Sequence, residues 1–195
     1  MTYHGLVTDS DVAGAFRAVP RAGFLPPEAR GSAAFDQPLP IGHGQTNSQP
    51  WTVRYMLELL DVRRGQRVLD LGSGSGWTTA LLSHLVGEKG EVVGVERVPG
   101  LTAFGRANLA AQPLAWARIE QARTGVLGWP DAAPYDRILV SAMAEAFPDD
   151  LLDQLGPDGV LVVPVAGQMM RAHRTGAAVA FERMGAFTFV PLVRD

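Results

Sequence analysis

The stretch VLDLGSGSGW, residues 68 to 77, decides the fold of this chain. An apolar run ends at Asp70 and Leu71, and glycines follow at positions 72, 74 and 76. Glycine lets the backbone turn sharply and approach a ligand closely, and a helix that begins near Trp77 would point its N-terminal N–H groups at that ligand. The stretch therefore predicts a strand, a ligand-binding turn and a helix.

The class of ligand follows from the spacing of these glycines. The spacing is G-x-G-x-G, whereas the dinucleotide fingerprint is G-x-G-x-x-G, and Trp77 occupies its third glycine position here. This difference disfavours NAD and FAD and suits a ligand without a pyrophosphate, such as S-adenosylmethionine. A glycine-rich turn that binds nothing is the alternative.

An acid further along the chain favours a nucleoside ligand. The run GEVVGVERV contains Glu96, twenty positions after Gly76. A carboxylate at the end of the second strand can accept both hydroxyls of a ribose. Glu96 could instead pair only with Arg97 or a surface lysine. The glycine turn and Glu96 together predict an adenosine site at the carboxyl edge of the sheet, where open α/β sheets bind their ligands.

Apolar runs and helical spacings alternate over the rest of the chain, which indicates a mostly parallel sheet with right-handed crossovers and both faces covered. The predicted strands are 67–71, 91–96, a weak one near 117–121, 135–141 and 159–165, and the predicted helices are 77–86, 100–110 and 148–155. Asp136, at the start of one strand, is expected to orient structure at the opposite edge. After Gly167, AAVAFERM and FTFVPLV predict two more strands and an antiparallel finish.

The first part of the chain predicts helices over 8–19 and 51–60. Between them, AAFDQPLPIGHGQTNSQP carries three prolines and two glycines and is expected to be irregular. We interpret residues 1–195 as a single α/β domain. It comprises a helical and loop extension over 1–60 that covers the site, a cofactor-binding core over 61–166 and C-terminal strands over 167–195.

Composition excludes several classes of protein. Net charge is −3 and no Lys/Arg block occurs, so the basic face of a nucleic-acid-binding protein is missing. The absence of cysteine excludes disulfides and thiolate metal sites, and the four histidines lack the spacing of a metal site. No apolar run of about 18 residues predicts a membrane span. The N-terminus lacks the pattern of a signal peptide, so a cytoplasmic protein is expected.

Six motifs resemble the protein-L-isoaspartate O-methyltransferases over about residues 12 to 193. They are VPRAGFLPPE, QPLPIGHGQTNSQP, RVLDLGSGSGWTTALL, VVGVERVPGL, GWPDAAPYDRILVSAMAEAFPDDLLDQLGPDGVLVVPV and FVPLV. T-x-S-Q-P with V-P-R-x-x-F upstream is more specific than the glycine turn. The resemblance implies a Rossmann-like class I methyltransferase fold, with a doubly wound sheet, and S-adenosylmethionine as cofactor. The implied partners are isoaspartyl peptides or proteins, whose α-carboxylate is esterified before it collapses to a succinimide. A monomer is expected.

The resemblance also assigns roles to individual residues, and Ser48 is the implied catalytic residue. The cofactor is assigned Thr46, Asp70, Gly72, Ser73, Gly74, Gly76, Glu96, Arg97, Thr124 and Gly125, with Asp70 expected to hold the backbone of the glycine turn. The peptide is assigned Arg21, Gln45, Pro164 and Val165. No metal is implied. A serine hydroxyl in the cleft can donate to the substrate carboxylate and aim it, because a carboxylate needs no strong base to attack a sulfonium.

Several positions depart from the family pattern. Arg123-Thr124-Gly125 stands where Gly-Asp-Gly is usual, Asn47 where isoleucine is common, Ala22 where histidine or glutamate is common, and Glu145 where proline usually follows the alanine run. These departures leave open a relative that methylates another peptide or a small acid. A non-catalytic cofactor-binding protein that keeps the fold is a further alternative, as is an oxidoreductase or an unrelated Rossmann protein.

Overall fold

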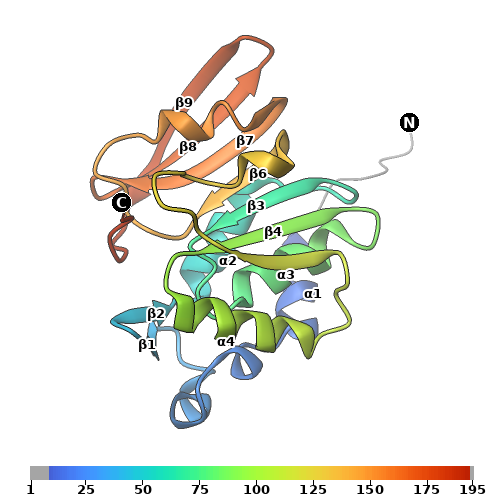
Figure 1. The fold of residues 1–195 in the computed structure, drawn as a ribbon, viewed down its shortest axis with the longest axis vertical. Coiled ribbons are helices and arrows are strands. Elements are labelled where there is room, and N and C mark those ends of the chain that lie inside the picture. The colour runs from blue at the N-terminus through green and yellow to red at the C-terminus, as the bar shows by residue number, and fades with distance from the viewer. Residues whose placement is uncertain (1–8, 194–195) are drawn as a thin grey trace.

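The computed structural model describes residues 9 to 193, and a single seven-stranded sheet forms its centre (Figure 1). The strands lie in the order β5-β4-β3-β6-β7-β8-β9. Their bounds are β3 (Arg67–Leu71), β4 (Glu91–Glu96), β5 (Ala117–Gln121), β6 (Tyr135–Val140), β7 (Leu155–Val165), β8 (Gln168–Thr175) and β9 (Ala178–Ala186). Strands β3 to β7 pair in parallel, whereas β8 and β9 pair antiparallel. The predicted mostly parallel sheet with an antiparallel finish is confirmed.

Four α-helices cover one face of this sheet. They are α1 (Asp9–Ala18), α2 (Pro50–Leu60), α3 (Trp77–Val86) and α4 (Pro99–Ala110), and each contributes to one apolar cluster. In that cluster Val12, Leu57, Leu81 and Leu109 from the helices join strand residues such as Val68. The extension, residues 1–60, and the cofactor-binding part of the chain thus contribute side chains to the same apolar cluster. None of the helices between residues 9 and 193 is long and apolar enough to cross a membrane.

The other face is covered by connections that contain only short 3-10 turns, η3 (Pro130–Ala132) and η4 (Asp149–Leu151). Trp129 and Leu151 pack there on strand residues such as Leu69, and within residues 9–193 no α-helix joins this cluster. The predicted helix over 148–155 is wrong. The side-chain amide of Gln154 instead binds the preceding loop: it accepts from Trp129 N–H at 2.9 Å and donates to Leu127 O at 2.7 Å. Strand β7 then begins at the next residue.

The antiparallel finish uses other residues than the sequence predicted. β9 corresponds to the predicted strand over 177–184, but 187–193 forms only an isolated bridge, between Met143 and Pro191. The second strand is β8, whose burial does not alternate along its length. Its cations obscure the pattern because their stems pack and their heads bind backbone carbonyls, as Arg171 does with Leu59 O at 2.9 Å.

The extension contains more regular structure than expected. Two 3-10 turns, η1 (Arg21–Phe24) and η2 (Pro27–Ser32), precede a hairpin of β1 (Leu39–Gly42) and β2 (Gln45–Asn47). The prediction of an irregular segment is wrong here, because positive φ at positions 42, 43 and 44 closes a tight turn between the two strands. The hairpin packs on α4 through an apolar cluster that includes Leu39, Ile41 and Leu101.

Candidate active site

The glycine turn after β3 is held in one shape by close packing. Gly72, Gly74 and Gly76 have φ values of 84°, 53° and 85°, a region that favours glycine. A Cβ added at Gly105 of α4 would lie 2.8 Å from Gly74 O. The N–H groups of Gly72 and Ser73 both donate to Val95 O, at 2.8 and 3.1 Å. The turn is therefore fixed between β4 and α4, with its backbone at the carboxyl edge of the sheet.

Glu96 closes this turn with its carboxylate. Oε2 accepts from Gly74 N–H at 2.8 Å and Oε1 accepts from Val98 N–H at 2.7 Å. The side chain is buried, yet it lines the cavity described below. A carboxylate has about four acceptor positions, so two remain for hydroxyl groups of a ligand. Glu96 thus both shapes the turn and faces the cavity.

A cavity of about 700 Å³ lies at this edge of the sheet. Its wall combines the hairpin, the glycine turn, the carboxyl ends of β4, β5 and β6, and the last segment of the described chain. The lining residues are Ile41, Gln45, Thr46, Leu71, Gly72, Gly74, Val95 to Pro99, Gln121 to Leu127, Ser141, Ala142, Asp150 and Val190 to Val193. Apolar side chains alternate with a few polar groups, as in sites that hold a small organic molecule.

The cavity brings together about half of the residues predicted from the sequence. Those that line it are Gln45, Thr46, Gly72, Gly74, Glu96, Arg97, Thr124 and Gly125. The remaining predicted residues, Arg21, Ser48, Asp70, Ser73, Gly76, Pro164 and Val165, lie outside its lining. Ser48 follows Thr46 by two positions and is half-buried. Gly76 serves packing, since a Cβ there would lie 3.1 Å from Gly105 O.

The family resemblance assigned Arg21 to the peptide. In the structure its side chain instead lies beneath the segment that precedes α2. It is 6% exposed. Its guanidinium donates to Asn47 Oδ1 at 2.7 Å and to the carbonyl oxygens of Ala33, Phe35, Gln37, Asn47 and Ser48. Burial lowers the pKa of Arg21 to about 10, against the opposing charge of Asp36, so the group stays a cation at neutral pH. With every nitrogen engaged, Arg21 holds the chain that carries Ser48.

Asp70 lies behind the glycine turn, fully buried at the end of β3. Its Oδ2 accepts from Thr79 Oγ at 2.6 Å, and its Oδ1 has no hydrogen-bond partner among the described residues. Burial raises the pKa of Asp70 to about 7, the Thr79 hydroxyl opposes this, and Glu96 adds to it. The Ser73 hydroxyl is also buried without a partner in the described part of the chain. The expectation that Asp70 holds the backbone of the glycine turn is wrong, because within residues 9–193 its side chain bonds to Thr79 of α3 and to no N–H group of the turn.

Pro164 and Val165 end β7 at some remove from the cavity lining. Pro164 O accepts from Ala144 N–H at 2.9 Å, and Val165 forms a bridge with Ala144. They support the segment after β6. That segment reaches the cavity with Ser141 and Ala142.

Several lining residues were not predicted from the sequence. Gln121, Ser141 and Ala142 directly follow or end strands that were predicted, so the rule that ligands bind at carboxyl ends of strands could have found them. Val190 to Val193 come from the far end of the chain and reach the cavity because Met143 N–H donates to Val190 O and Leu192 N–H donates to Met143 O, both at 2.7 Å. No local sequence signal marks that pairing.

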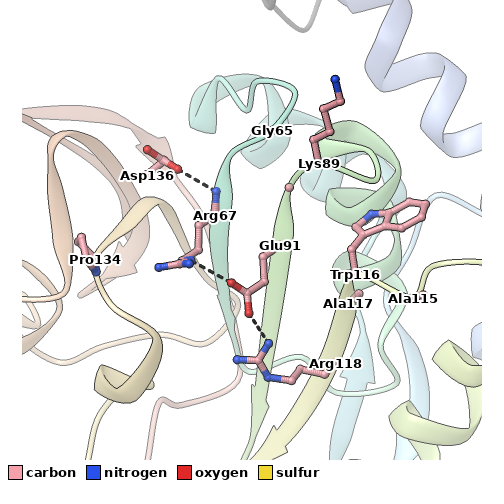
Figure 2. A pocket seen from close by; sticks show the side chains of 11 residues that line it. Gly65, Arg67, Lys89, Glu91, Ala115, Trp116, Ala117, Arg118, Pro134 and Asp136 are labelled. Atoms are coloured by element: carbon pink, nitrogen blue, oxygen red, sulfur yellow. Dashed lines mark hydrogen bonds and ion pairs between the residues drawn. The ribbon is translucent and has the colours of Figure 1, made fainter.

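A second cleft, of about 630 Å³, lies at the opposite edge of the sheet (Figure 2). Glu91 lies between two arginines there, 2.9 Å from Arg67 Nε and in contact with Arg118. Asp136 accepts from Arg67 N–H at 2.8 Å, as its expected role at this edge requires. Glu91 and the two arginines of this cleft thus pair with one another, and they lie at the amino ends of the strands, away from the glycine turn.

Comparison with known proteins gives consistent matches. A model of the family described as Protein-L-isoaspartate(D-aspartate) O-methyltransferase (PCMT) matches residues 1–195. A Protein-L-isoaspartate O-methyltransferase of Methanopyrus kandleri is 42% identical over 98% of this chain and 87% of its own length. A solved structure of a protein-L-isoaspartate O-methyltransferase superposes with a TM-score of 0.85 at 26% identity, over 94% of this chain and 61% of that one.

A further solved structure has the same fold. It is a putative protein-L-isoaspartate O-methyltransferase from Plasmodium falciparum in complex with S-adenosyl-L-homocysteine, with a TM-score of 0.82 at 24% identity. The match covers 97% of this chain and 93% of that one. The two chains therefore share their fold over nearly their full lengths.

Proposed function

Because this chain belongs to the protein-L-isoaspartate(D-aspartate) O-methyltransferase family, we propose that it methylates the α-carboxylate of isoaspartyl residues in damaged peptides and proteins. Membership confirms the resemblance drawn from the sequence and makes the chain an enzyme that uses S-adenosylmethionine. The observation that carries the proposal is the cavity itself: the glycine turn, Glu96 and the segment before α2 converge on one space at the carboxyl edge of the sheet.

The cavity residues fit S-adenosylmethionine. Glu96 has acceptor positions left for the two ribose hydroxyls after it accepts from Gly74 and Val98. Ala122 to Leu127 would enclose the adenine, with Thr124 offering a hydroxyl. Gly72 and Gly74 bring backbone, without side chains, to the remaining part of the ligand. A volume of about 700 Å³ is in the range of sites for ligands of this size.

Catalysis by this chain is mainly a matter of position. When bound, S-adenosylmethionine supplies an electrophilic methyl group, and the substrate carboxylate forms the C–O bond as the electron pair of the C–S bond goes to sulfur. The residues of the chain need only hold the reacting groups in line, because neither partner requires a proton transfer, and such positioning can contribute several kcal/mol, roughly up to 10. The apolar part of the lining, which includes Val95, Leu127 and Leu192, would limit the access of water once both ligands are bound.

Ser48 is assigned the aiming of the substrate carboxylate. Thr46 lines the cavity and Ser48 lies two residues further, and Arg21 fixes this piece of chain by donating to the carbonyl oxygens of Asn47 and Ser48. A hydroxyl held in this way can donate to a carboxylate oxygen, which orients the nucleophile. Gln45, beside Thr46 in the lining, is the second polar group that a peptide would meet.

The test is methyl transfer from labelled S-adenosylmethionine to an isoaspartyl peptide beside its aspartyl twin of the same sequence. We expect label only on the isoaspartyl peptide, as a base-labile ester. Equal labelling of the two peptides, or labelling of neither, would reject the repair function. Calorimetry with S-adenosylhomocysteine separates a loss of cofactor binding from a different methyl acceptor.

The site residue is tested separately. Ser48→Ala should lower kcat by roughly 100-fold, as misplacement of a reacting group does, and leave the affinity for S-adenosylhomocysteine unchanged. Thr52→Ala, one turn into α2 and outside the cavity lining, is the matched control for a lost hydroxyl. A Ser48→Ala enzyme that keeps wild-type kcat would remove Ser48 from the mechanism.

We infer that the enzyme acts as a monomer in the cytoplasm. One chain supplies every group assigned above, so no second copy is needed to complete the site. The lack of cysteine means that no disulfide supports the fold, as is usual for cytoplasmic proteins. Sedimentation of the purified protein tests the monomer, and a dimer that dissociates only with loss of activity would overturn it.

A further inference from the structure

Asn47 connects two parts of the site that meet different ligands. Its Oδ1 accepts from Arg21 Nε at 2.7 Å and its Nδ2 donates to Ser75 Oγ at 3.0 Å. Asn47 and Ser75 are 5% and 2% exposed. Ser75 belongs to the glycine turn, and Asn47 lies between the residues assigned to cofactor and peptide. One buried amide thus links the segment before α2 to the turn that would hold the cofactor.

The hairpin dictates this inward orientation. Asn47 is the last residue of β2 and pairs with Leu39 of β1, and both side chains are buried, whereas Thr46 and Pro40 of the neighbouring pair are exposed. Strand side chains alternate between faces. The side chain that points at the glycine turn is therefore Asn47, and its neighbour Thr46 is left for the cavity.

The far side of the link is also anchored. The Ser75 carbonyl accepts from Asn108 Nδ2 of α4 at 2.9 Å. Arg21, on the near side, donates both to the Asn47 side chain and to the Ser48 carbonyl, at 2.9 Å for the latter. A chain of hydrogen bonds thus joins the glycine turn to Ser48, and the two bonds made by the Asn47 side chain are buried.

We propose that Asn47 is a positioning residue that couples cofactor binding at the glycine turn to the placement of Ser48, by way of Ser75. This rests on the proposed function in its assignment of Ser48 to the substrate. A cofactor bound against the glycine turn would reduce the remaining motion of Ser75, and Ser75 would reduce that of the segment 46–48 through the Asn47 amide. Cofactor and peptide would therefore bind with positive cooperativity, which is reciprocal between the two sites.

The test measures amide hydrogen exchange of residues 44 to 49 with and without saturating S-adenosylhomocysteine, without any methyl acceptor. In the wild type we expect the ligand to slow exchange over this segment. Asn47→Leu, of similar size but without hydrogen bonds, and the milder Ser75→Ala should each reduce that ligand-dependent slowing by roughly tenfold, the equivalent of one buried hydrogen bond. Gln37→Ala, exposed and joined to Arg21 only by its carbonyl, should behave as wild type.

Asn47→Asp separates coupling from a merely structural role. Its carboxylate would still accept from Arg21, and the Ser75 hydroxyl can turn and donate to the second oxygen. We therefore expect Asn47→Asp to keep the ligand-dependent slowing and the double variant Asn47→Asp, Ser75→Ala to lose it. In kinetics, the variants that lose the coupling, Asn47→Leu and Ser75→Ala, should raise KM for peptide at saturating cofactor, and thermal melts of each variant report on the fold.

Two results would overturn the proposal. One is a wild-type segment 44–49 whose exchange does not respond to S-adenosylhomocysteine when calorimetry shows that the ligand is bound. The other is a Ser75→Ala protein that melts like wild type and keeps the full ligand-dependent slowing. Failure to methylate isoaspartyl peptides, with the coupling intact, would reject the proposed function alone, because the exchange measurement uses no peptide.

Discussion

Strand β4 carries a glutamate at each end, and the two have opposite surroundings. Glu96 lies at the carboxyl end, and within residues 9–193 its carboxylate accepts only from backbone N–H groups. Glu91, at the amino end, lies between Arg67 and Arg118 (Figure 2). A hydrogen bond from Arg118 is the main reason that the pKa of Glu91 lies below its ordinary value. One carboxylate keeps acceptor capacity for a ligand, and the other is neutralised by side chains.

The direction of the sheet explains this difference. At the carboxyl ends of parallel strands the chain turns into loops and helix starts that present N–H groups, which bind anions and hydroxyl oxygens. At the amino ends, strands arrive from loops on the surface and their charged side chains pair with one another. Two clefts of similar volume, about 700 and 630 Å³, therefore present different groups to a ligand. The residue type alone does not separate them.

The largest expected effect is on Glu96. Glu96→Gln places an amide N–H₂ against one of the N–H groups of Gly74 and Val98 and removes the charge from the remaining bonds. We expect S-adenosylhomocysteine to bind roughly 10- to 100-fold more weakly, from the loss of a charge-assisted hydrogen bond. Calorimetry measures this affinity. Glu91→Gln is the control, and its affinity for S-adenosylhomocysteine should change by less than about twofold. Equal losses of affinity in the two variants would contradict the different roles of the two glutamates.

A pair of glycines extends the comparison to packing. Gly105→Ala places a methyl group 2.8 Å from Gly74 O, so the glycine turn must move and S-adenosylhomocysteine affinity should fall by roughly tenfold. Gly90→Ala, at the other edge, places a methyl group 2.6 Å from Val86 Cβ and 2.7 Å from Gln66 O. It should lower the free energy of unfolding by about 1–3 kcal/mol. Its affinity for the ligand, measured below the melting temperature, should stay at the wild-type value.

The sequence predicted the central part of the fold well. The bounds of β3, α3, β4 and β5 agree with the predictions to the residue. For the first three the reason is that β3 and β4 are buried and that the glycine turn marks the start of α3. In β5 only Ile119 is buried, which is why its signal in the sequence is weak. It could not place β8, whose cations carry no clear alternation, nor the pairing of Val190 with Met143, which joins distant parts of the chain. Long-range pairing of this kind depends on tertiary contacts that no local pattern records.

In the site, the sequence identified which residues matter more readily than the face of the chain on which each side chain lies. The glycine turn and Glu96 were identified by spacing, and both lie at the cavity. The face of Asn47 was not predictable, because a shift of one residue in the register of β2 would exchange its position with that of Thr46. Arg21 was expected at the peptide, but the number of carbonyl oxygens around its guanidinium depends on how residues 33 to 48 fold around it.

A pH experiment tests the third acid, Asp70, which is buried near Glu96 and hydrogen-bonded to Thr79. Its folded pKa of about 7 lies above the ordinary value of 3.8. The folded state therefore holds a proton that the unfolded chain has released, so the stability that Asp70 contributes falls as pH rises from about 4 to 7. Between pH 5 and 8 the Tm of the wild type should fall by at least about 3 °C more than the Tm of Asp70→Asn. This difference in Tm corresponds to the free energy of roughly one pKa unit.

Comparing the wild type with Asp70→Asn also cancels the pH dependence that other titrating groups contribute to Tm. Burial lowers the pKa of His84, which works in the opposite direction in part of this range, but it is common to both proteins. Parallel Tm curves for the two proteins from pH 5 to 8 would show that Asp70 is ionised in the fold at neutral pH.

The smallest expected effect is on the stability contributed by Glu91. Its carboxylate is about a third exposed, and its arginine partners are 45% and 42% exposed, so solvent screens both pairs. Glu91→Gln should therefore lower the free energy of unfolding by less than about 1 kcal/mol, and added salt should shrink the difference further.

Because the folded pKa of Glu91 is depressed, its contribution to stability is present above the ordinary value of 4.5 and is lost as pH falls below it, opposite in sign to Asp70. Urea titrations at pH 7 and pH 4 measure both; a loss that grows at low pH would contradict the role of the two arginines.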